Sequence, residues 1–493
     1  MPLFESRLDL YEHLAANKAA ILAEAQKIGA GLGIPVDLKG RFGTSGANSS
    51  LPGALRNDIV QAIERDAMQV RPLKHLGDEI RRTVKSVYGD DYDAAPTNSC
   101  EAAIGVAFDA LLTPPLLGRG EPYRARCIGL IERHCEHHLS YGRPFPPRYK
   151  DLFADRGATA GELGIAGRAN QNTDIVMVPL AGASYALHGI KFYPTPLLMG
   201  TDAAATTKAL SRAASTHARD LSGFVSLGYD TAGYGCGTKN GDGAPQLLSN
   251  IGELAAEYGV PYVCDNAWGT PFLGTDPRRI GADVMLYSMD KVAGASTSGL
   301  IIGREGPMVN IRRALGIHGE RFGATSAHGK ASHVAADPGK MTMTGMLAAL
   351  RVLRDRPQMV TKPIDTTYAV VVDEYERAKG DIGEGIVITK SYNLGGVELN
   401  YEGTWSNKRF GIPIFNNEDR VAGSHLLNLC TAEMGVLPGQ ADDANVIINP
   451  GLGTVDEQGV VIEERMRHAV RALFASMALL RRWVDRGPQQ DKA

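Results

Sequence analysis

The sequence lacks several features that would place the protein in a membrane or outside the cell. No stretch approaches 18 apolar residues, and the N-terminus, MPLFESRLDLYEHL, carries charges where a signal peptide would be apolar. The six cysteines show no CxxC pair and no zinc spacing, which is typical of reduced thiols. The net charge of -3 gives no sign of bulk nucleic-acid affinity. We therefore expect a soluble cytoplasmic protein, with neither a membrane nor a nucleic acid as a partner.

Glycine is abundant instead, at 57 residues, and strand-like and helix-like segments alternate from about residue 95 to 305. The apolar runs typical of strands are 126–131, 175–179, 223–227, 261–265, 284–288 and 299–303. Helical segments such as 244–258 lie between several of them. This alternation predicts an α/β fold with a doubly wound, mostly parallel sheet and helices on both faces.

The sequence on either side of this region follows another pattern. Helices are predicted over 5–31, 53–88, 340–378 and 462–484, and short strands within 385–401. We therefore expect an N-terminal helical segment (1–94), a large domain (95–305), and a linker helix with a smaller α+β C-terminal domain (306–493). The N-terminal segment should join the small domain in space.

Asp265 and Lys291 decide the functional interpretation. Each follows an apolar run, and 26 residues separate them. Because parallel sheets bind ligands at the carboxyl ends of their strands, both side chains should point into one crevice. A lysine can form a Schiff base with pyridoxal phosphate, and an acid can pair with its pyridinium nitrogen. Either residue alone is more often a solvated side chain or a turn cap; together, with Ser288 three residues before the lysine, they favour this cofactor.

A phosphate site is predicted where a helix begins after residue 98. Ser99 and Cys100 lie in the run Pro-Thr-Asn-Ser-Cys-Glu-Ala-Ala (96–103). Small residues at a helix start leave backbone N–H groups open to an anion, and the helix dipole adds attraction. Ser288 can donate its hydroxyl to the same phosphate. An ordinary helix cap with a capping glutamate is the alternative reading.

Histidines cluster in the run Ile-Glu-Arg-His-Cys-Glu-His-His-Leu-Ser (131–140). An imidazole that stacks on the pyridine ring is expected here, with His137 as the first choice and His134 as the second. A surface cluster is the alternative. No second ligand cluster accompanies the run, so we expect no metal site.

Together these residues resemble those of the fold type I pyridoxal-phosphate-dependent enzymes, the aspartate aminotransferase superfamily, over roughly residues 95–305. The resemblance implies that Asp265 is the partner of the pyridine nitrogen and that Lys291 carries the cofactor. It implies that Ala267 packs under the ring and that Ser99, Cys100 and Ser288 hold the phosphate. It also implies a homodimer with active sites at the subunit interface.

Two local resemblances point to different reactions. The run Asp-Asn-Ala-Trp-Gly-Thr-Pro-Phe (265–272) is similar to valine–pyruvate-type aminotransferases, but Trp268 replaces their tyrosine. Gly299 stands where class I aminotransferases have an arginine. The run 288–294 instead resembles the selenium transferases that make selenocysteine on tRNA, which eliminate a side-chain substituent and add a nucleophile.

The expected activity is therefore that of a transferase or lyase acting on a free amino acid through external aldimine and quinonoid intermediates. We expect β- or γ-elimination or replacement, with carbon–carbon bond formation to a second small substrate as a variant. An aminotransferase, a tRNA-linked selenium-transferase-like enzyme and a catalytically silent relative remain alternatives.

Substrate-binding residues are expected outside the large domain. Arg409 and Arg420 are the candidates for the substrate carboxylate, because a guanidinium fork matches two oxygens. Thr44 and Ser45, in a glycine-rich loop, are candidates for a lid over the substrate; a plain turn is equally plausible. The loop 228–237 could line the site or carry a second acid or base, and a plain surface loop is the alternative.

Overall fold

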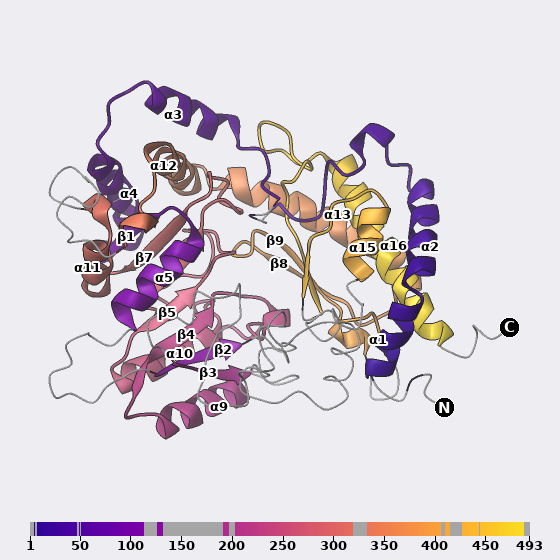
Figure 1. Cartoon of the computed structure of the whole chain (residues 1–493), viewed down its shortest axis with the longest axis horizontal. Helices are drawn as coiled ribbons and strands as arrows, with labels where there is room; N and C mark the ends of the chain where they lie inside the picture. Colours follow the sequence, from indigo (N-terminus) through magenta and orange to yellow (C-terminus); the bar gives the residue numbers. More distant parts are fainter. Residues whose placement is uncertain are drawn as a thin grey trace.

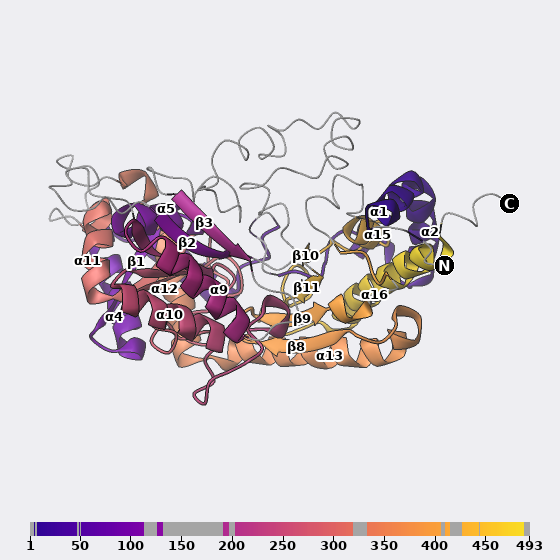
Figure 2. The same cartoon turned by 90° about the horizontal axis from the view of Figure 1, so that it is seen from below.

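Two lobes make up the described part of the chain in a computed structural model of residues 1–493 (Figures 1 and 2). The described residues are 4, 7–46, 49, 51–112, 126–131, 191–196, 203–318, 333–405, 410–414, 426–442 and 444–487. One lobe is built around a seven-stranded sheet and the other around a four-stranded sheet. The first and last described helices, α1 (Arg7–Ala16) and α16 (Glu463–Arg486), both lie in the smaller lobe (Figure 1).

The large sheet is mostly parallel. Its strands are β1 (Tyr92–Thr97), β2 (Arg126–Ile131), β3 (Lys191–Pro196), β4 (Leu221–Leu227), β5 (Tyr262–Asp265), β6 (Val284–Ser288) and β7 (Gly299–Arg304), in the spatial order β1-β7-β6-β5-β4-β2-β3. Only β7 runs antiparallel to its neighbours β1 and β6 among these strands. Every residue of β5 and β6 is buried, as expected for parallel strands covered by helices.

Helices from several parts of the chain surround this sheet. They are α3 (Asn57–Ala67), α4 (Leu73–Tyr88), α5 (Cys100–Leu111), α9 (Ala203–Thr216), α10 (Gln246–Tyr258), α11 (Glu305–Ala314) and α12 (Lys340–Asp355). The helix α5 packs against β5, β6 and β7. At the other end of the sheet, α9 packs against β2 and β3, and α10 packs against β4 and β5. The helix α12 packs on α3 and α4. Helices that precede the sheet in sequence (α3 and α4) and one that follows it (α12) therefore form one layer.

The smaller lobe contains an antiparallel sheet of order β10-β11-β9-β8. Its strands are β8 (Val387–Ser391), β9 (Gly396–Asn400), β10 (Gln440–Asp442) and β11 (Asn445–Ile448), and its helices are α1 (Arg7–Ala16), α2 (Lys18–Gly31), α13 (Gln358–Ile382), α15 (Leu426–Glu433) and α16 (Glu463–Arg486). Short 3-10 turns cover Val36–Leu38, Ala232–Tyr234, Gly316–His318, Val334–Ala336 and Glu402–Thr404.

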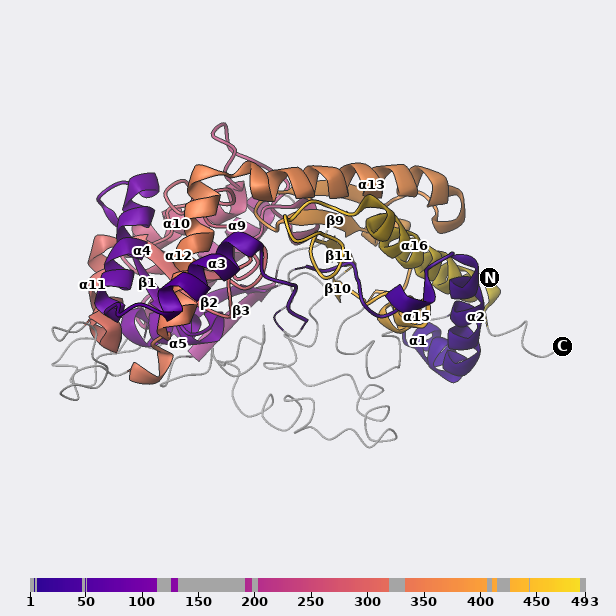
Figure 3. The same cartoon turned by 90° about the horizontal axis from the view of Figure 1, so that it is seen from above.

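Two hydrophobic cores correspond to the two lobes. The first contains buried side chains between Ile59 and Ile364, and the second combines residues 4–42 with residues 370–484. The N-terminal helices α1 and α2 thus complete the core of the C-terminal lobe. The helix α13 joins the cores, because Val360 and Ile364 belong to the first and Val370 and Val371 to the second (Figure 3).

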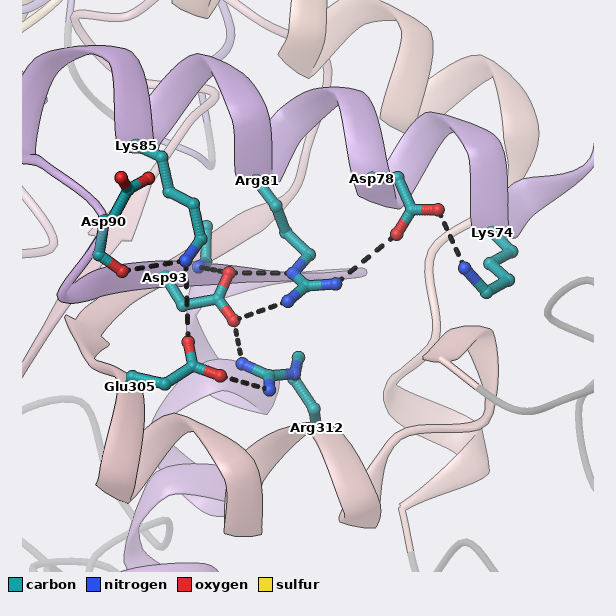
Figure 4. A network of polar contacts seen from close by, with 9 residues as sticks. Lys74, Asp78, Arg81, Lys85, Asp90, Asp93, Glu305 and Arg312 are labelled. Carbon is teal, nitrogen blue, oxygen red and sulfur yellow. Dashed lines mark hydrogen bonds and ion pairs between the residues drawn. The ribbon is translucent and has the colours of Figure 1, made fainter.

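A buried ion-pair network fixes the outer edge of the large sheet (Figure 4). Asp93 on β1 is fully buried and accepts hydrogen bonds from Arg81 on α4, at 2.8 and 2.9 Å. Arg312 on α11 also bonds Asp93, and it reaches Glu305 at 2.9 Å. A buried carboxylate needs such partners because desolvation penalises an unpaired charge. The network therefore ties α4, β1 and α11 together.

The structure confirms most of the segments predicted from periodicity, with breaks at specific residues. The predicted helix 53–88 divides into α3 and α4 before Pro72, and the stretch 340–378 divides into α12 and α13 at Arg356 and Pro357. A proline fixes its own backbone and restricts the residue before it, which ends a helix. The predicted strand 175–179 lies outside the described residues, and the proposed domain limits stay a prediction. None of the described helices is both long and apolar enough to cross a membrane.

Candidate active site

The predicted site residues on the large sheet gather at one edge. Asp265 ends β5 and Ser288 ends β6, which are neighbouring parallel strands. Gly299, the first residue of the antiparallel strand β7, pairs with Ser288 on one side and with Thr97, the last residue of β1, on the other. The carboxyl ends of β1, β5 and β6 therefore lie at the same edge of the sheet, where ligands bind in open α/β sheets.

Lys291 lies in a tight loop that follows β6. Hydrogen bonds from Met289 N to Ser298 O at 2.9 Å and from Ala295 N to Met289 O at 2.8 Å close this loop. The Lys291 Nζ atom is 4.9 Å from the ring centroid of Trp268, in the geometry of a cation–π contact. Trp268 is itself buried and packs in one cluster with Tyr229 and Tyr234. The lysine amine thus lies over the ring of Trp268, which belongs to the loop after β5.

Asp265 is buried, with 6% of its surface exposed. One carboxylate oxygen, Oδ1, accepts a hydrogen bond from Ala267 N at 3.1 Å. The adjacent Asn266 is fully buried and donates to Asn393 Oδ1 of the smaller lobe at 3.0 Å. Asn393 also donates to Gly228 O at 2.8 Å. The strand end that carries Asp265 is therefore fixed from both lobes.

The helix α5 begins at the same edge. Ser99 is its N-cap, and its hydroxyl accepts a hydrogen bond from Ala102 N at 3.1 Å, as the alternative cap reading predicted. Burial raises the pKa of the Cys100 thiol well above its usual range, and the carboxylate of Asp265 raises it further. Burial and Asp265 also raise the pKa of Glu101. The raised pKa keeps Cys100 a neutral thiol.

The hydroxyl of Ser288 has a partner that the sequence did not predict. It donates to Asp290 Oδ1, so it is not directed at a phosphate in this structure. The other oxygen, Asp290 Oδ2, is buried and has no hydrogen-bond partner among the described residues. Ser288 has a single proton to donate, so a bound phosphate and Asp290 would compete for it.

Gly299 allows the turn that starts α5 to pack directly on β7. A Cβ atom at this position would lie 2.2 Å from Ser99 O and 2.4 Å from Thr97 Oγ1. Any larger residue would therefore displace the turn that starts α5. The arginine that class I aminotransferases have at this position would not fit here, because its Cβ would clash with Ser99 and Thr97.

A cavity of about 300 Å³ lies beside Lys291. We call it the Lys291 cavity. Its polar lining includes Arg56, Asp290, Lys291, Ser296 and Thr297. Its apolar lining includes Leu55, Val292, Met359, Val360, Ile364 and Val455. The cavity thus combines the loop of Lys291, the chain before α3, the start of α13 and the loop after β11.

Arg56 was not predicted from the sequence. It stands 235 residues before Lys291, just before α3, where no motif marks it. Periodicity and motif spacing describe neighbours in sequence, whereas Arg56 reaches the site through the path of the chain from α2 to α3, which crosses between the lobes (Figure 1). Only the fold reveals its position.

Thr44 and Ser45 belong to a loop that is fixed to the smaller lobe. Both side chains are fully buried, and neither hydroxyl has a hydrogen-bond partner among the described residues. Backbone hydrogen bonds join Thr44 N to Leu437 O at 3.2 Å and Asn449 N to Thr44 O at 2.9 Å. Any movement of this loop as a lid would therefore require the smaller lobe to move with it.

The loop 228–237 also bridges the two lobes. Thr231 Oγ1 donates to Glu398 Oε1 at 2.7 Å, and Gly233 N donates to Glu398 Oε2 at 3.1 Å. Ser391 donates to Asp230 Oδ1 at 2.6 Å, and burial raises the pKa of Asp230. The smaller lobe thereby holds this loop beside the Trp268 cluster.

Four predicted site residues, His134, His137, Arg409 and Arg420, lie outside the described residues. They stay predictions. Within the described ranges, no group of three or more His, Cys, Asp or Glu side chains could hold a metal ion.

Comparison with solved structures identifies the architecture. A crystal structure of a complex of SepCysS with the N-terminal domain of SepCysE matches with a TM-score of 0.50 at 10% sequence identity, covering 89% of this chain and 95% of that chain. The chain has the type I fold of pyridoxal-phosphate-dependent enzymes. No protein-family model matches the sequence, and a comparison with curated proteins gives no match.

Two aminotransferases are among the other solved structures that are similar to this chain. The multiple substrate aminotransferase from Thermococcus profundus has a TM-score of 0.49 at 12% identity, covering 93% of this chain and 95% of that chain. An aspartate aminotransferase mutant from Thermus thermophilus has a TM-score of 0.48 at 13% identity, covering 93% and 96%.

Proposed function

We propose that the chain is a pyridoxal-phosphate-dependent enzyme with Lys291 as the cofactor-binding lysine. The observation that carries this proposal is that Asp265, Ser288 and the N-terminus of α5 meet at one sheet edge, with Lys291 in the loop directly after Ser288. A buried acid, a lysine and a helix N-terminus are the three groups that the pyridine nitrogen, the aldehyde and the phosphate require. The type I fold supports the same assignment.

The residues present fit the cofactor. Asp265 would pair with the pyridine nitrogen, because a buried carboxylate favours a charged donor as its partner. The backbone of Ser99 and Cys100 would bind the phosphate, and Ala267 would contact the ring. Ser288 would join the phosphate site once its hydroxyl turns away from Asp290. His137 remains the proposed stacking residue on the ring.

The cofactor supplies an electron sink for the charge that develops at the substrate Cα. The chain supplies the proton transfers and the orientation. The free amine of Lys291 would take the Cα proton on Nζ. The Trp268 ring, 4.9 Å from Nζ, attracts the ammonium form that results. Asp265 would keep the pyridine nitrogen protonated.

For the reaction, we propose β- or γ-elimination or replacement on a free amino acid. Trp268 has no hydroxyl to bond the phenolic oxygen of the cofactor, unlike the tyrosine of the aminotransferases that this segment resembles. Transamination is the second candidate. It is supported by Tyr229, which carries a phenol hydroxyl and is buried in the same cluster as Trp268. The net charge of -3 does not favour a tRNA-linked substrate.

A spectral screen tests this proposal. The cofactor-loaded protein is mixed with single amino acids and S-adenosylmethionine, and each mixture is followed by absorbance and mass spectrometry. Loss of a substituent from the substrate, with the cofactor unchanged at the end, is the expected result. Stoichiometric conversion of the cofactor to its amine form with release of a keto acid would establish the aminotransferase instead. No substrate-dependent change with any compound would contradict both.

We also propose that the enzyme is a cytoplasmic homodimer that shares its active sites between subunits, as the resemblance implies. The mass in solution, measured by light scattering, tests the assembly. A monomer at micromolar concentration would contradict it.

A further inference from the structure

Arg56 lines the Lys291 cavity together with the reactive lysine. Its side chain is 13% exposed, so most of it is enclosed by protein. Arginine at such a position is seldom an accidental surface residue, because burying a charge is costly unless partners compensate for it. The partners of Arg56 therefore show what the side chain is placed to do.

One edge of the guanidinium is already occupied. Arg56 Nε donates to Asp58 Oδ1 at 3.3 Å, and the other oxygen of Asp58 accepts from Arg356 Nη2 at 2.8 Å. Arg56 Nη2 is buried and has no hydrogen-bond partner among the described residues. Asp58 thus orients the fork through Nε and leaves a terminal nitrogen unsatisfied, which is costly unless an acceptor completes it.

Two glycines lie against this side chain. A Cβ atom on Gly459 would lie 3.3 Å from Arg56 Cδ, and one on Gly294 would lie 3.6 Å from Nη1. Both glycines have left-handed backbones, with φ of +82° and +70°. Gly294 belongs to the loop of Lys291 and Gly459 to the smaller lobe. Arg56 therefore passes between the two parts of the chain that form the site.

We propose that Arg56 binds the anionic group of the substrate in the Lys291 cavity. The short aliphatic part of the substrate packs against Met359, Val360 and Ile364, which line the same cavity. The unsatisfied Nη2 leaves the guanidinium able to donate to an oxygen of a carboxylate or a phosphate. The substrate class is an amino acid with an anion and a short apolar portion. The inference rests on the proposed function, since it takes Lys291 as the reacting residue.

The anion can be the α-carboxylate or a group on the side chain, and the experiment distinguishes them. Half-saturation concentrations are measured by absorbance with cofactor-loaded wild type and Arg56→Gln, for L-norvaline, L-norvalinamide and O-phospho-L-serine. If Arg56 binds the α-carboxylate, the substitution raises the half-saturation concentration of norvaline at least tenfold and leaves that of norvalinamide unchanged. If Arg56 binds a side-chain anion, the substitution raises the half-saturation concentration of phosphoserine at least tenfold and leaves that of norvaline unchanged. Equal values for wild type and variant with all three compounds would overturn the proposal.

Matched variants separate anion binding from a structural role. Arg356→Gln removes the other partner of Asp58 without touching the cavity, and its half-saturation values should equal those of wild type. Arg56→Lys should restore part of the lost affinity, because it keeps the charge but not the fork. An Arg356→Gln variant as impaired as Arg56→Gln would show that Arg56 acts only through the ion pair and would overturn the proposal.

A failure of the proposed function gives a different signature. Arg56→Gln should still hold the cofactor in a form that borohydride reduces onto Lys291. If wild type holds no cofactor, thermal unfolding of the cofactor-free protein is followed with inorganic phosphate and with butyrate. A rise in melting temperature that Arg56→Gln abolishes would then support the anion site by itself, and its absence would overturn it.

Discussion

The Nζ atom of Lys291 lies 4.9 Å from the ring centroid of Trp268. The two residues come from loops after neighbouring parallel strands, β6 and β5, so the register of the sheet determines their approach. Trp268 occupies the position of a tyrosine in the aminotransferases that this segment resembles. Its ring provides a face for the lysine but no hydroxyl, and this difference is the basis for proposing elimination or replacement.

Trp268 should report cofactor binding by its fluorescence. The chain has three tryptophans, and Trp268 alone lines the proposed cofactor site, whereas Trp405 and Trp483 pack with the second core. Pyridoxal phosphate absorbs where tryptophan emits, so energy transfer should quench the nearest indole most. We expect Trp268→Phe to lose most of the quenching seen on cofactor addition, and Trp483→Phe to keep it. The opposite pattern would place the cofactor elsewhere.

Asp265→Asn should leave the fold intact and lower the turnover rate at least about 100-fold, which corresponds to roughly 2.7 kcal/mol. The amide is isosteric but cannot keep the pyridine nitrogen protonated. Turnover on the substrate found in the spectral screen measures the effect. Asp276→Asn, which removes a carboxylate that pairs with Arg278 on the surface, is the control. Similar rates in the two variants would refute the role of Asp265.

Gly299→Ala should weaken cofactor binding at least about tenfold, or roughly 1.4 kcal/mol. Its Cβ would lie 2.2 Å from Ser99 O, so the turn that starts α5 must shift. The dissociation constant of pyridoxal phosphate, measured by absorbance titration, shows the effect. Gly306→Ala is the matched control, because no atom lies within 4 Å of its Cβ position and alanine favours the helix α11. An unchanged affinity in Gly299→Ala would show that this turn does not form the phosphate site.

Much of the fold and part of this site follow from sequence. The strands that carry Asp265 and Ser288 are short apolar runs that end at polar motifs, and the structure has them where they were predicted. Four of the described strands were missed: β1 and β3 contain prolines, which argue against a strand, and β10 and β11 are only three and four residues long. Arg56 and the hydrogen bond from Ser288 to Asp290 were also missed, because tertiary packing and side-chain rotation decide them.

The network around Asp93 should be essential for stability (Figure 4). Asp93→Ala leaves Arg81 and Arg312 without their buried partner, and we expect a loss of about 3–5 kcal/mol in the free energy of unfolding. Lys74→Ala removes a partly exposed i,i+4 pair with Asp78 on the same helix, and we expect a change of no more than about 0.5 kcal/mol. Urea unfolding measures both. Comparable losses would contradict the distinction between buried and exposed pairs.

Asp337 should make stability depend on pH. Burial raises the pKa of this carboxyl to about 6, although Gly316 N donates to it at 3.0 Å. The folded chain then binds more protons than the unfolded chain between about pH 4 and 6, so stability falls as the pH rises through this window. Asp337→Asn should be more stable than wild type above pH 6, by about 1 kcal/mol after allowance for partial exposure. Melting temperatures from pH 4 to 7 test this, and a constant difference between the two proteins would contradict it.

The most direct test of the central claim is to map the lysine that carries the cofactor. The protein is loaded with pyridoxal phosphate, reduced with borohydride, digested and analysed by mass spectrometry, beside Lys291→Ala. We predict one pyridoxyl-modified peptide, containing Lys291, and none in the variant. A reduced adduct on another lysine, or an equal yield of adduct in Lys291→Ala, would contradict the assignment of the active site.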